Sequence, residues 1–364
     1  MEHLRDWFKR QLGDPQVMSL LVVLALSTVL IVNFGGYMGP VLASIVIAYL
    51  LEGSVVRLEL WGLKRLLATA LVWLAFVIST ILIIFALVPL LSRQLTQALQ
   101  ELPTIITSAQ QFMLELAQRY PELISAKQVE GVVDVAGSDI GSLRQTLVER
   151  SLVVGEGVMY LMIYLVLVPL MVFFLLKDKV SVLKWVTSFL PKNNPLLSHV
   201  WLEIDLQLSN YVRGKFIEIV IVWAVSYAVF ALFGLNYALL LSVLVGVSVL
   251  VPYIGAIVAT FPIAFVAYAQ WGFTDPMAWT MGAYAVIQFL DGNILVPLLF
   301  SEVTNLHPVA IISAVLFFGG IWGFWGVFFA IPLATVVNAV INAWRRGGQS
   351  FAASQPITRE ASAD

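Results

Sequence analysis

From Phe216 to Trp344 the chain contains no lysine and no arginine, and nearly all of this stretch is apolar. A soluble protein has to cover its surface with polar groups, and about 25% of the residues in an ordinary globular chain are charged. In this chain of 364 residues only 12% are charged and 60% are hydrophobic. A buried core cannot account for that excess, so the lipid bilayer is the remaining solvent. The sequence therefore predicts an all-α membrane protein, because helices satisfy their own backbone hydrogen bonds in lipid.

The apolar runs differ in length, which indicates more than one kind of membrane segment. A simple helical span needs about 20 residues, whereas several runs are shorter and the last is much longer. The runs are 17–34, 37–51, 67–91, 152–176, 216–233, 237–251, 256–271, 278–299 and 309–343. We therefore predict a polytopic transmembrane helical bundle with broken helices and re-entrant hairpins, accompanied by small extramembrane helical segments.

The distribution of lysine and arginine predicts the orientation, since both residues collect in cytoplasmic loops. Three of them lie in residues 1–16, three in 52–66 and six in 177–215. Arg345 and Arg346 follow the last apolar run. We expect both termini in the cytoplasm, a membrane hairpin at 17–51, and an external position for the stretch 92–151.

The same pattern divides the chain into six segments. These are 1–91 with N-terminal transmembrane segments, 92–151 as an external, periplasmic-side helical segment, 152–176 as a transmembrane helix, 177–215 as a cytoplasmic amphipathic helical segment, 216–344 as the C-terminal transmembrane transport core, and 345–364 as a cytoplasmic disordered tail. We expect an amphipathic helix that begins at Pro103 and ends at Pro121, and another that begins at Asn194-Pro195.

Both flanks of the transport core are expected in the cytoplasm, so the chain must cross the membrane an even number of times within the core. The sequence does not determine how many crossings there are. In one arrangement 216–233 crosses outward, 237–271 dips in and returns around 252–255, and 278–299 crosses inward. The run 309–343 would then form a hairpin bent at Gly319–Gly326.

Several chemistries lack sequence support. The chain has no cysteine and only three histidines, and it shows no zinc-protease motif, Walker A motif or serine elbow. No basic patch with interleaved aromatic residues suggests nucleic acid as a partner. We therefore expect no catalytic residues, no cofactor, no bound metal and no enzymatic activity.

Asp291 is the carboxylate that lies deepest in an apolar run. It follows Gln288 and precedes Gly292-Asn293, and a charge at mid-bilayer costs about 2.5–3.5 kcal/mol. Asp-Gly-Asn is turn chemistry, which in mid-span predicts a broken helix lining a polar cavity. Asp291 then either caps a half-helix or, with Gln288 and Asn293, binds a cation, a proton or a polar solute.

Other residues of the apolar third carry weaker signals. Glu218 is expected to form an interfacial ion pair with Arg213 or Lys215, or else to lie in the transport path. Tyr253 is either an interface anchor or a cavity wall. Glycines and prolines interrupt the helices, either for close packing or as hinges for alternating access. The candidate hinge residues are Pro252, Gly255, Gly292, Pro297, Gly319, Gly320, Gly323 and Gly326.

An ordered set of short motifs resembles the autoinducer-2 exporter family, the PerM-like permeases of bacterial inner membranes. The motifs are Pro40…Ala48-Tyr49-Leu50-Leu51, Phe173-Phe174-Leu175-Leu176-Lys177-Asp178, Asp205…Tyr211-Val212-Arg213-Gly214-Lys215, Val251-Pro252-Tyr253-Ile254-Gly255, Gln288…Asp291-Gly292-Asn293…Pro297, Leu306-His307-Pro308, Gly323-Phe324-Trp325-Gly326 and Ala330-Ile331-Pro332. The order holds over nearly the whole chain except 92–151. Lys179, Lys215 and Asp291 depart from the family pattern, which favours Gly, Gln and Glu there.

The resemblance implies a multi-pass permease of the inner membrane that works without ATP and assembles as a homo-oligomer, with a pentamer expected. Asp178, Asp205 and Arg213 would be interfacial charges. We expect a secondary transporter that exports a small polar signalling solute by alternating access, with the lipid bilayer and either the solute or Na⁺/H⁺ as partners. Two alternatives stay open: a sodium(lithium)/proton antiporter that uses Asp291, and a non-transporting envelope scaffold.

Overall fold

The described part of the chain is helical throughout and contains no strand. The computed structural model describes residues 33, 37–119, 154–188, 195–300 and 307–338. Its helices are α3 (Gly39–Leu60), α4 (Arg65–Arg119), α6 (Val154–Lys177), α7 (Lys179–Ser188), α8 (Pro195–Leu232), α9 (Ala238–Ser248), α10 (Ile254–Trp271), α11 (Asp275–Leu290), the π-helical turn η1 (Asp291–Leu295), α12 (Val296–Phe300) and α13 (Pro308–Phe328). A further helical stretch covers 330–338. The predicted all-α fold is confirmed.

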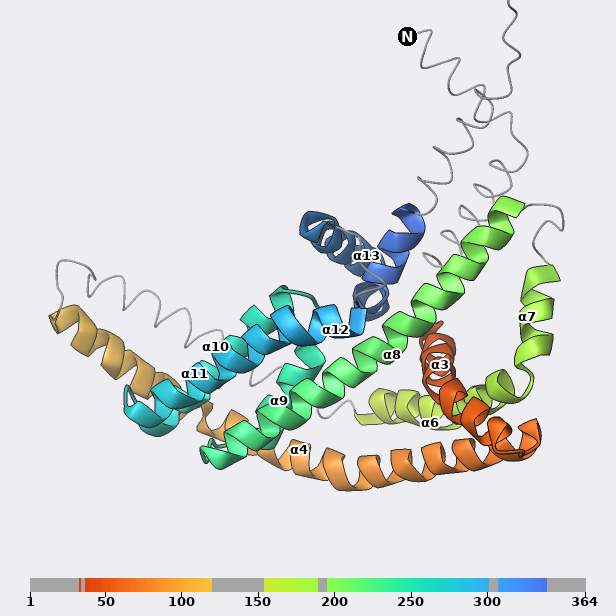
Figure 1. Cartoon of the computed structure of the whole chain (residues 1–364). Helices are drawn as coiled ribbons and strands as arrows, with labels where there is room; N and C mark the ends of the chain where they lie inside the picture. The colour runs from red at the N-terminus through yellow and green to blue at the C-terminus, as the bar shows by residue number, and fades with distance from the viewer. Residues whose placement is uncertain (1–32, 34–36, 120–153, 189–194, 301–306, 339–364) are drawn as a thin grey trace, which may run out of the picture. The chain divides into compact units, whose positions relative to one another are not determined.

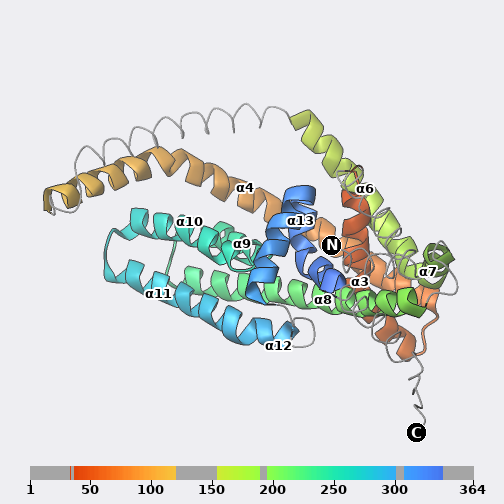
Figure 2. The ribbon, with the colours of Figure 1, turned by 90° about the horizontal axis from the view of Figure 1, so that it is seen from above.

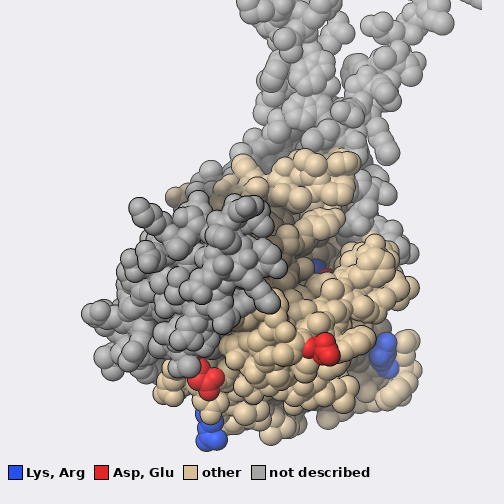
Figure 3. Space-filling view, turned by 90° about the vertical axis from the view of Figure 1, so that its left-hand side faces the viewer, with Lys and Arg blue, Asp and Glu red and all other residues tan. Residues whose placement is uncertain are grey.

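Six helical stretches within the described residues are long and apolar enough to cross a membrane. They are Gly39–Leu60, Arg65–Glu101, Asp205–Leu232, Ile254–Trp271, Asp275–Phe300 and Pro308–Phe328, with Met162–Lys177 and Ala238–Ser248 as shorter apolar helices. Large apolar side chains are exposed along these helices, and the described part of the face in Figure 3 carries few charged groups. Such a surface suits lipid rather than water.

The described residues form two compact units, and each draws on separate stretches of sequence. One unit comprises 37–50, 174–188, 195–213, 300 and 307–338, and the other comprises 51–119, 154–173 and 214–299. The second unit holds α9, α10 and α11, and α10 packs against both α9 and α11 (Figure 1, Figure 2).

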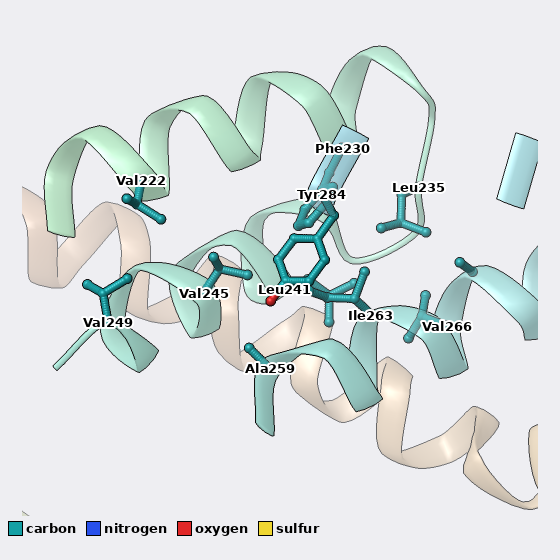
Figure 4. Packing of buried hydrophobic residues seen from close by; sticks show 11 residues of the cluster. Val222, Phe230, Leu235, Leu241, Val245, Val249, Ala259, Ile263, Val266 and Tyr284 are labelled. Carbon is teal, nitrogen blue, oxygen red and sulfur yellow. The ribbon is translucent and has the colours of Figure 1, made fainter. Parts of the chain in front are cut away.

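The core of the second unit lies where α8, α9, α10 and α11 meet. Val222 and Phe230 of α8 face Val245 of α9 and Ile263 of α10, and Tyr284 of α11 completes the cluster (Figure 4). The Tyr284 hydroxyl is not left unsatisfied, because it donates a hydrogen bond to the carbonyl oxygen of Ala256 at 3.0 Å. This packing holds the membrane helices that carry the candidate site.

One predicted helix boundary is wrong. The helix expected to begin at Pro103 is part of α4, which starts at Arg65 and runs without a break to Arg119. The helix that begins at Pro195, as predicted, continues past Lys215 to Leu232, so one helix runs through the predicted segment boundary at 215/216. Proline and charge are local signals, and a helix can continue through both when its packing and solvent allow.

The turn expected near 252–255 separates two packed helices, α9 and α10. Tyr253 adopts φ 63°, and a Cβ placed on Gly255 would lie 1.7 Å from the carbonyl oxygen of Ser248. The end of α9 and the start of α10 therefore approach each other through the space that only glycine leaves open. With 11 residues, α9 is too short for a full span.

The bend expected in 309–343 is confirmed at Gly323, which has φ 58° and ψ −134° in the middle of α13. A Cβ on Gly326 would lie 1.9 Å from the carbonyl oxygen of Phe318, and one on Gly319 would lie 2.8 Å from Val327 Cγ2. The two arms of α13 thus fold back on each other at glycines.

Some predictions fall on residues that the structure does not describe. They include most of the hairpin 17–51, much of the external stretch 92–151, and the tail 345–364. The orientation of the termini and the six-segment division stay predictions.

Candidate functional site

A buried lysine–glutamate pair lies on α8. Lys215 Nζ donates to Glu218 Oε2 at 2.7 Å, and it also donates to the carbonyl oxygen of Val249 at 2.8 Å. Lys215 is 4% exposed and Glu218 is 2% exposed, so both charges are withdrawn from solvent. The expected pairing of Glu218 with Lys215 is present within the second unit, and its expected position at the membrane interface stays a prediction.

Val249 connects this pair to the end of a half-helix. It is the C-terminal cap of α9, directly after Ser248. The last carbonyl groups of a helix have no partner within the helix and carry the negative end of its dipole. The Lys215 ammonium therefore satisfies one carboxylate and one helix-end carbonyl at the same time.

Asp291 lies close enough to interact electrostatically with both Lys215 and Glu218. Its Oδ1 atom is buried and has no hydrogen-bond partner within the described residues. Gln288 lies one turn earlier on α11, and its buried Nε2 also has no hydrogen-bond partner within the described residues. The Tyr284 hydroxyl is nevertheless near enough to interact with the Gln288 amide. We call Lys215, Glu218, Gln288 and Asp291 the α8–α11 cluster.

The α8–α11 cluster carries one positive and two negative groups when all three are ionised. Its formal charge is then −1, so one further monovalent cation, or one proton on a carboxylate, makes it neutral. Buried charges persist only when they are paired and hydrogen-bonded. A formal charge of −1 in a mostly buried cluster is therefore costly without a further positive group.

A π-helical turn replaces the helix break predicted at Asp291–Asn293. Asp291–Leu295 forms η1, and α12 continues the helix directly. Asp291 itself has helical φ −58° and ψ −58°. A π-helical turn frees backbone geometry without ending the helix, and such turns occur frequently at functional sites. The backbone irregularity therefore lies where it was predicted, but it is a π-helical turn and not a break in the helix.

Asn293 and Tyr253 lie apart from the contacts of the α8–α11 cluster. Asn293 is exposed, and its Nδ2 donates to the carbonyl oxygen of Phe289 at 2.9 Å within its own helix. Tyr253 is 55% exposed at the turn after α9. Roles for these two residues as ligands stay predictions.

Residues 6–346 match the family described as the AI-2E family transporter. The chain belongs to this family. It is 45% identical over 347 residues to PerM of Escherichia coli (strain K12), a protein named as a permease, and the match covers 95% of this chain and 98% of PerM. YueF of Bacillus subtilis (strain 168), named as a transport protein, is 25% identical over 304 residues, with 80% of each chain covered. The AI-2 transport protein TqsA of Escherichia coli (strain K12) is 23% identical over 313 residues, covering 86% of this chain and 87% of TqsA.

Membership in the AI-2E transporter family confirms the resemblance of the motifs and makes this chain a multi-pass membrane transporter. The relatives are named as permeases or transport proteins, which agrees with the expectation of a non-enzyme. Within the described residues, no group of three or more His, Cys, Asp or Glu side chains could hold a metal ion.

The three predicted interfacial charges of this transporter lie in the first unit. The Tyr49 hydroxyl donates to Asp205 Oδ1 at 2.5 Å, and Arg213 Nε donates to the carbonyl oxygen of Tyr49 at 3.3 Å. Both residues of α8 thus contact the same tyrosine of α3. Asp178 pairs with Lys177 at 3.7 Å, and both side chains are partly exposed.

The candidate hinge residues fall into two groups. Close packing accounts for three of the glycines, because a Cβ added to Gly255, Gly319 or Gly326 would clash with backbone or side-chain atoms. Gly323 provides the bend of α13. Gly292 and Gly320 have open space around them. Hinge motion at these glycines, at Pro252 and at Pro297 stays a prediction.

Sequence reasoning missed two parts of the α8–α11 cluster. It named no basic residue as a partner of Asp291, whereas the fold brings Lys215 into range from α8. It also gave no role to the carbonyl of Val249. The available signal was the position of Lys215 as the last basic residue before the apolar third.

Proposed function

We propose that this AI-2E family member is a secondary transporter that moves a small polar solute out of the cell by alternating access. The first solute to test is AI-2, because the relative TqsA is named as an AI-2 transport protein. Transport is driven by a proton or cation that binds and leaves the α8–α11 cluster, with Asp291 as the exchanging group.

The observation that carries this proposal is the α8–α11 cluster itself. Glu218 and Lys215 are almost fully buried, and Asp291 has a buried oxygen without a partner among the described residues. Intramembrane ionisable residues are expensive and usually mark ion or substrate pathways. A half-helix end at Val249 and a π-helical turn at Asp291 are the kind of irregular backbone that surrounds transporter sites.

The test is flux in proteoliposomes that contain the purified full-length chain. Labelled AI-2 is loaded on one side, and its movement is followed with and without an imposed pH gradient. We expect gradient-dependent movement by the wild type and loss of at least about 90% of it in Asp291→Asn, because an amide cannot exchange a proton at neutral pH. Asp275→Asn is the matched control, since Asp275 is an exposed carboxylate at the start of α11. Full coupled flux in Asp291→Asn would refute Asp291 as the exchanging group.

A sodium(lithium)/proton antiporter is the second candidate function. The formal charge of −1 and the unpartnered Asp291 oxygen favour it, because a small cation and a proton could alternate there. Pulses of sodium or lithium are added to the same liposomes with a pH-sensitive dye inside. Proton movement that depends on the pulse and disappears in Asp291→Asn supports antiport, whereas AI-2 movement without a response to the pulse supports the exporter.

A non-transporting envelope scaffold is separated from both functions by deleting 92–151. Flux that survives the deletion contradicts a scaffold whose external stretch recruits partners. Absence of any flux in the intact chain supports it. Assembly as a homo-oligomer, with five copies expected, and residence in the bacterial inner membrane with cytoplasmic termini belong to the same proposal. Native mass spectrometry and reporter fusions at the two ends test these features.

A further inference from the structure

Lys215 Nζ is bonded to oxygen atoms of the kinds that also coordinate sodium in secondary transporters. Its ammonium lies between a carboxylate oxygen at 2.7 Å and a helix-end carbonyl oxygen at 2.8 Å. Carboxylates, unwound backbone carbonyls and the C-terminal ends of half-helices are the oxygen donors that coordinate Na⁺ at the mid-membrane sites of secondary transporters. The same two oxygen atoms cannot serve an ammonium and a metal ion together.

The lysine is held in place from several directions. It is 4% exposed, Glu218 is 2% exposed, and Val249 is buried at the end of α9. The ammonium is an obligatory donor with three hydrogens and no acceptor capacity. Burying it among oxygen atoms is favourable for the same reason that burying Na⁺ there would be, because a positive charge offsets the carboxylate and the negative end of the helix.

We propose that Lys215 is a tethered cation that takes the place of a bound sodium ion, so that this transporter has no sodium requirement at the Glu218–Val249 position. Occupancy of this position by Lys215 does not depend on the function proposed above. The consequence for coupling does rest on that function: sodium has no site beside Glu218, so the exchange of a proton or a cation is left to Asp291.

The inference predicts that removal of the ammonium opens a sodium site. Glutamine in place of Lys215 has similar length, no charge and a carbonyl oxygen that can join Glu218 and Val249 as a third ligand. Lys215→Gln is therefore expected to bind Na⁺, whereas Lys215→Met offers no such oxygen. In Lys215→Gln/Glu218→Gln the carboxylate is also gone, and the attraction for a cation is lost.

Thermal unfolding of the purified full-length variants measures this binding without any transport. Each protein is heated in sodium chloride and in choline chloride at equal ionic strength. At a sodium concentration tenfold above its Kd, the Tm of Lys215→Gln is expected to rise by about 2 °C over its value in choline. The wild type, Lys215→Met and the double variant are expected to show no difference between the two salts.

Three outcomes overturn the inference. A sodium-specific rise in the wild type that persists in Asp291→Asn shows that sodium binds beside Glu218 despite the lysine. An equal rise in Lys215→Gln and Lys215→Met shows that sodium acts elsewhere. No rise in Lys215→Gln shows that the oxygen atoms beside Glu218 do not form a cation site. If Lys215→Gln does not fold, the wild-type comparison still decides the first outcome, and flux of the wild type with potassium or choline replacing sodium decides the coupling.

Failure of the proposed function looks different. If the wild type moves neither AI-2 nor protons, the transport proposal is refuted. The unfolding measurements still test whether Lys215 takes the place of a bound sodium ion. If AI-2 flux of the wild type stops when sodium is removed, and a sodium-specific rise in its Tm persists in Asp291→Asn, the transport proposal stands and the inference is refuted.

Discussion

Replacing one residue of the buried Lys215–Glu218 ion pair by an uncharged residue should destabilise the protein far more than replacing both. Removal of one member of a buried ion pair costs about 3–5 kcal/mol, because the other charge stays buried and uncompensated. Glu218→Gln takes away the carboxylate to which the ammonium donates at 2.7 Å, and Lys215→Met leaves Glu218 facing the like charge of Asp291. Replacement of both charges at once leaves Asp291 as the charged group of the α8–α11 cluster, whose formal charge stays at −1 as in the wild type, so the double variant should lie close to the wild type.

The size of the effect follows from the length of the chain. An unfolding entropy of about 2.1 cal/mol/K per residue, over 364 residues, gives about 0.76 kcal/mol/K. A loss of about 4 kcal/mol therefore lowers the Tm by about 5 °C in each single variant. The double-mutant cycle should then yield a coupling energy of at least about 3 kcal/mol.

The assay is thermal unfolding of the four proteins in detergent, with choline chloride as the salt. Glu59→Gln is the matched control, because Glu59 pairs with Arg65 at 3.2 Å where the two side chains are 29% and 31% exposed. Loss of a partly exposed pair should cost less than about 1 kcal/mol, or about 1 °C. Additive effects of the two single changes would refute the buried pair as the organising contact of this region.

Two further predictions concern packing. Gly255→Ala should lower the Tm by about 4 °C, because the new methyl group meets the Ser248 carbonyl and overpacking of this kind costs about 3 kcal/mol; Gly282→Ala, with open space around it on α11, should leave the Tm unchanged or slightly raised. Tyr211→Phe should lower the Tm by about 2 °C, since the buried hydroxyl donates to the Phe328 carbonyl at 2.8 Å and such a bond contributes about 1.5 kcal/mol. Differential scanning fluorimetry measures both, and a Gly255→Ala protein as stable as its control would contradict the close approach of α9 and α10.

The membrane character of this fold could be predicted from sequence because it depends on composition, which needs no knowledge of tertiary contacts. The bend at Gly323 could be found because clustered glycines in an apolar run are a local signal. The continuity of α4 through Pro103 could not be found in this way. A proline or a charge changes the local preference by a few kcal/mol, and a long helix in a favourable solvent outweighs that preference.

The sequence predicted Asp291 as part of the candidate site, but it did not predict that Lys215 lies near Asp291. Asp291 stands out because a carboxylate in an apolar run is expensive wherever the run folds. Its neighbour Lys215 is 76 positions away in the numbered sequence, and only the packing of α8 beside α11 brings the two charges into range. Sequence spacing carries no information on that packing.

The negative charge of the α8–α11 cluster follows from where the basic residues lie in the sequence, and it does not depend on how the membrane helices are rotated. Because no lysine or arginine occurs from Phe216 to Trp344, a lysine or arginine partner for the carboxylates of the α8–α11 cluster has to come from outside that stretch. Lys215 stands directly at its border and bonds Glu218 and the Val249 carbonyl, which leaves Asp291 with electrostatic attraction but no hydrogen bond to its buried Oδ1 among the described residues. One lysine cannot neutralise two carboxylates. In the proposed transport mechanism, the remaining negative charge takes up a proton or an ion on one side of the membrane and releases it on the other.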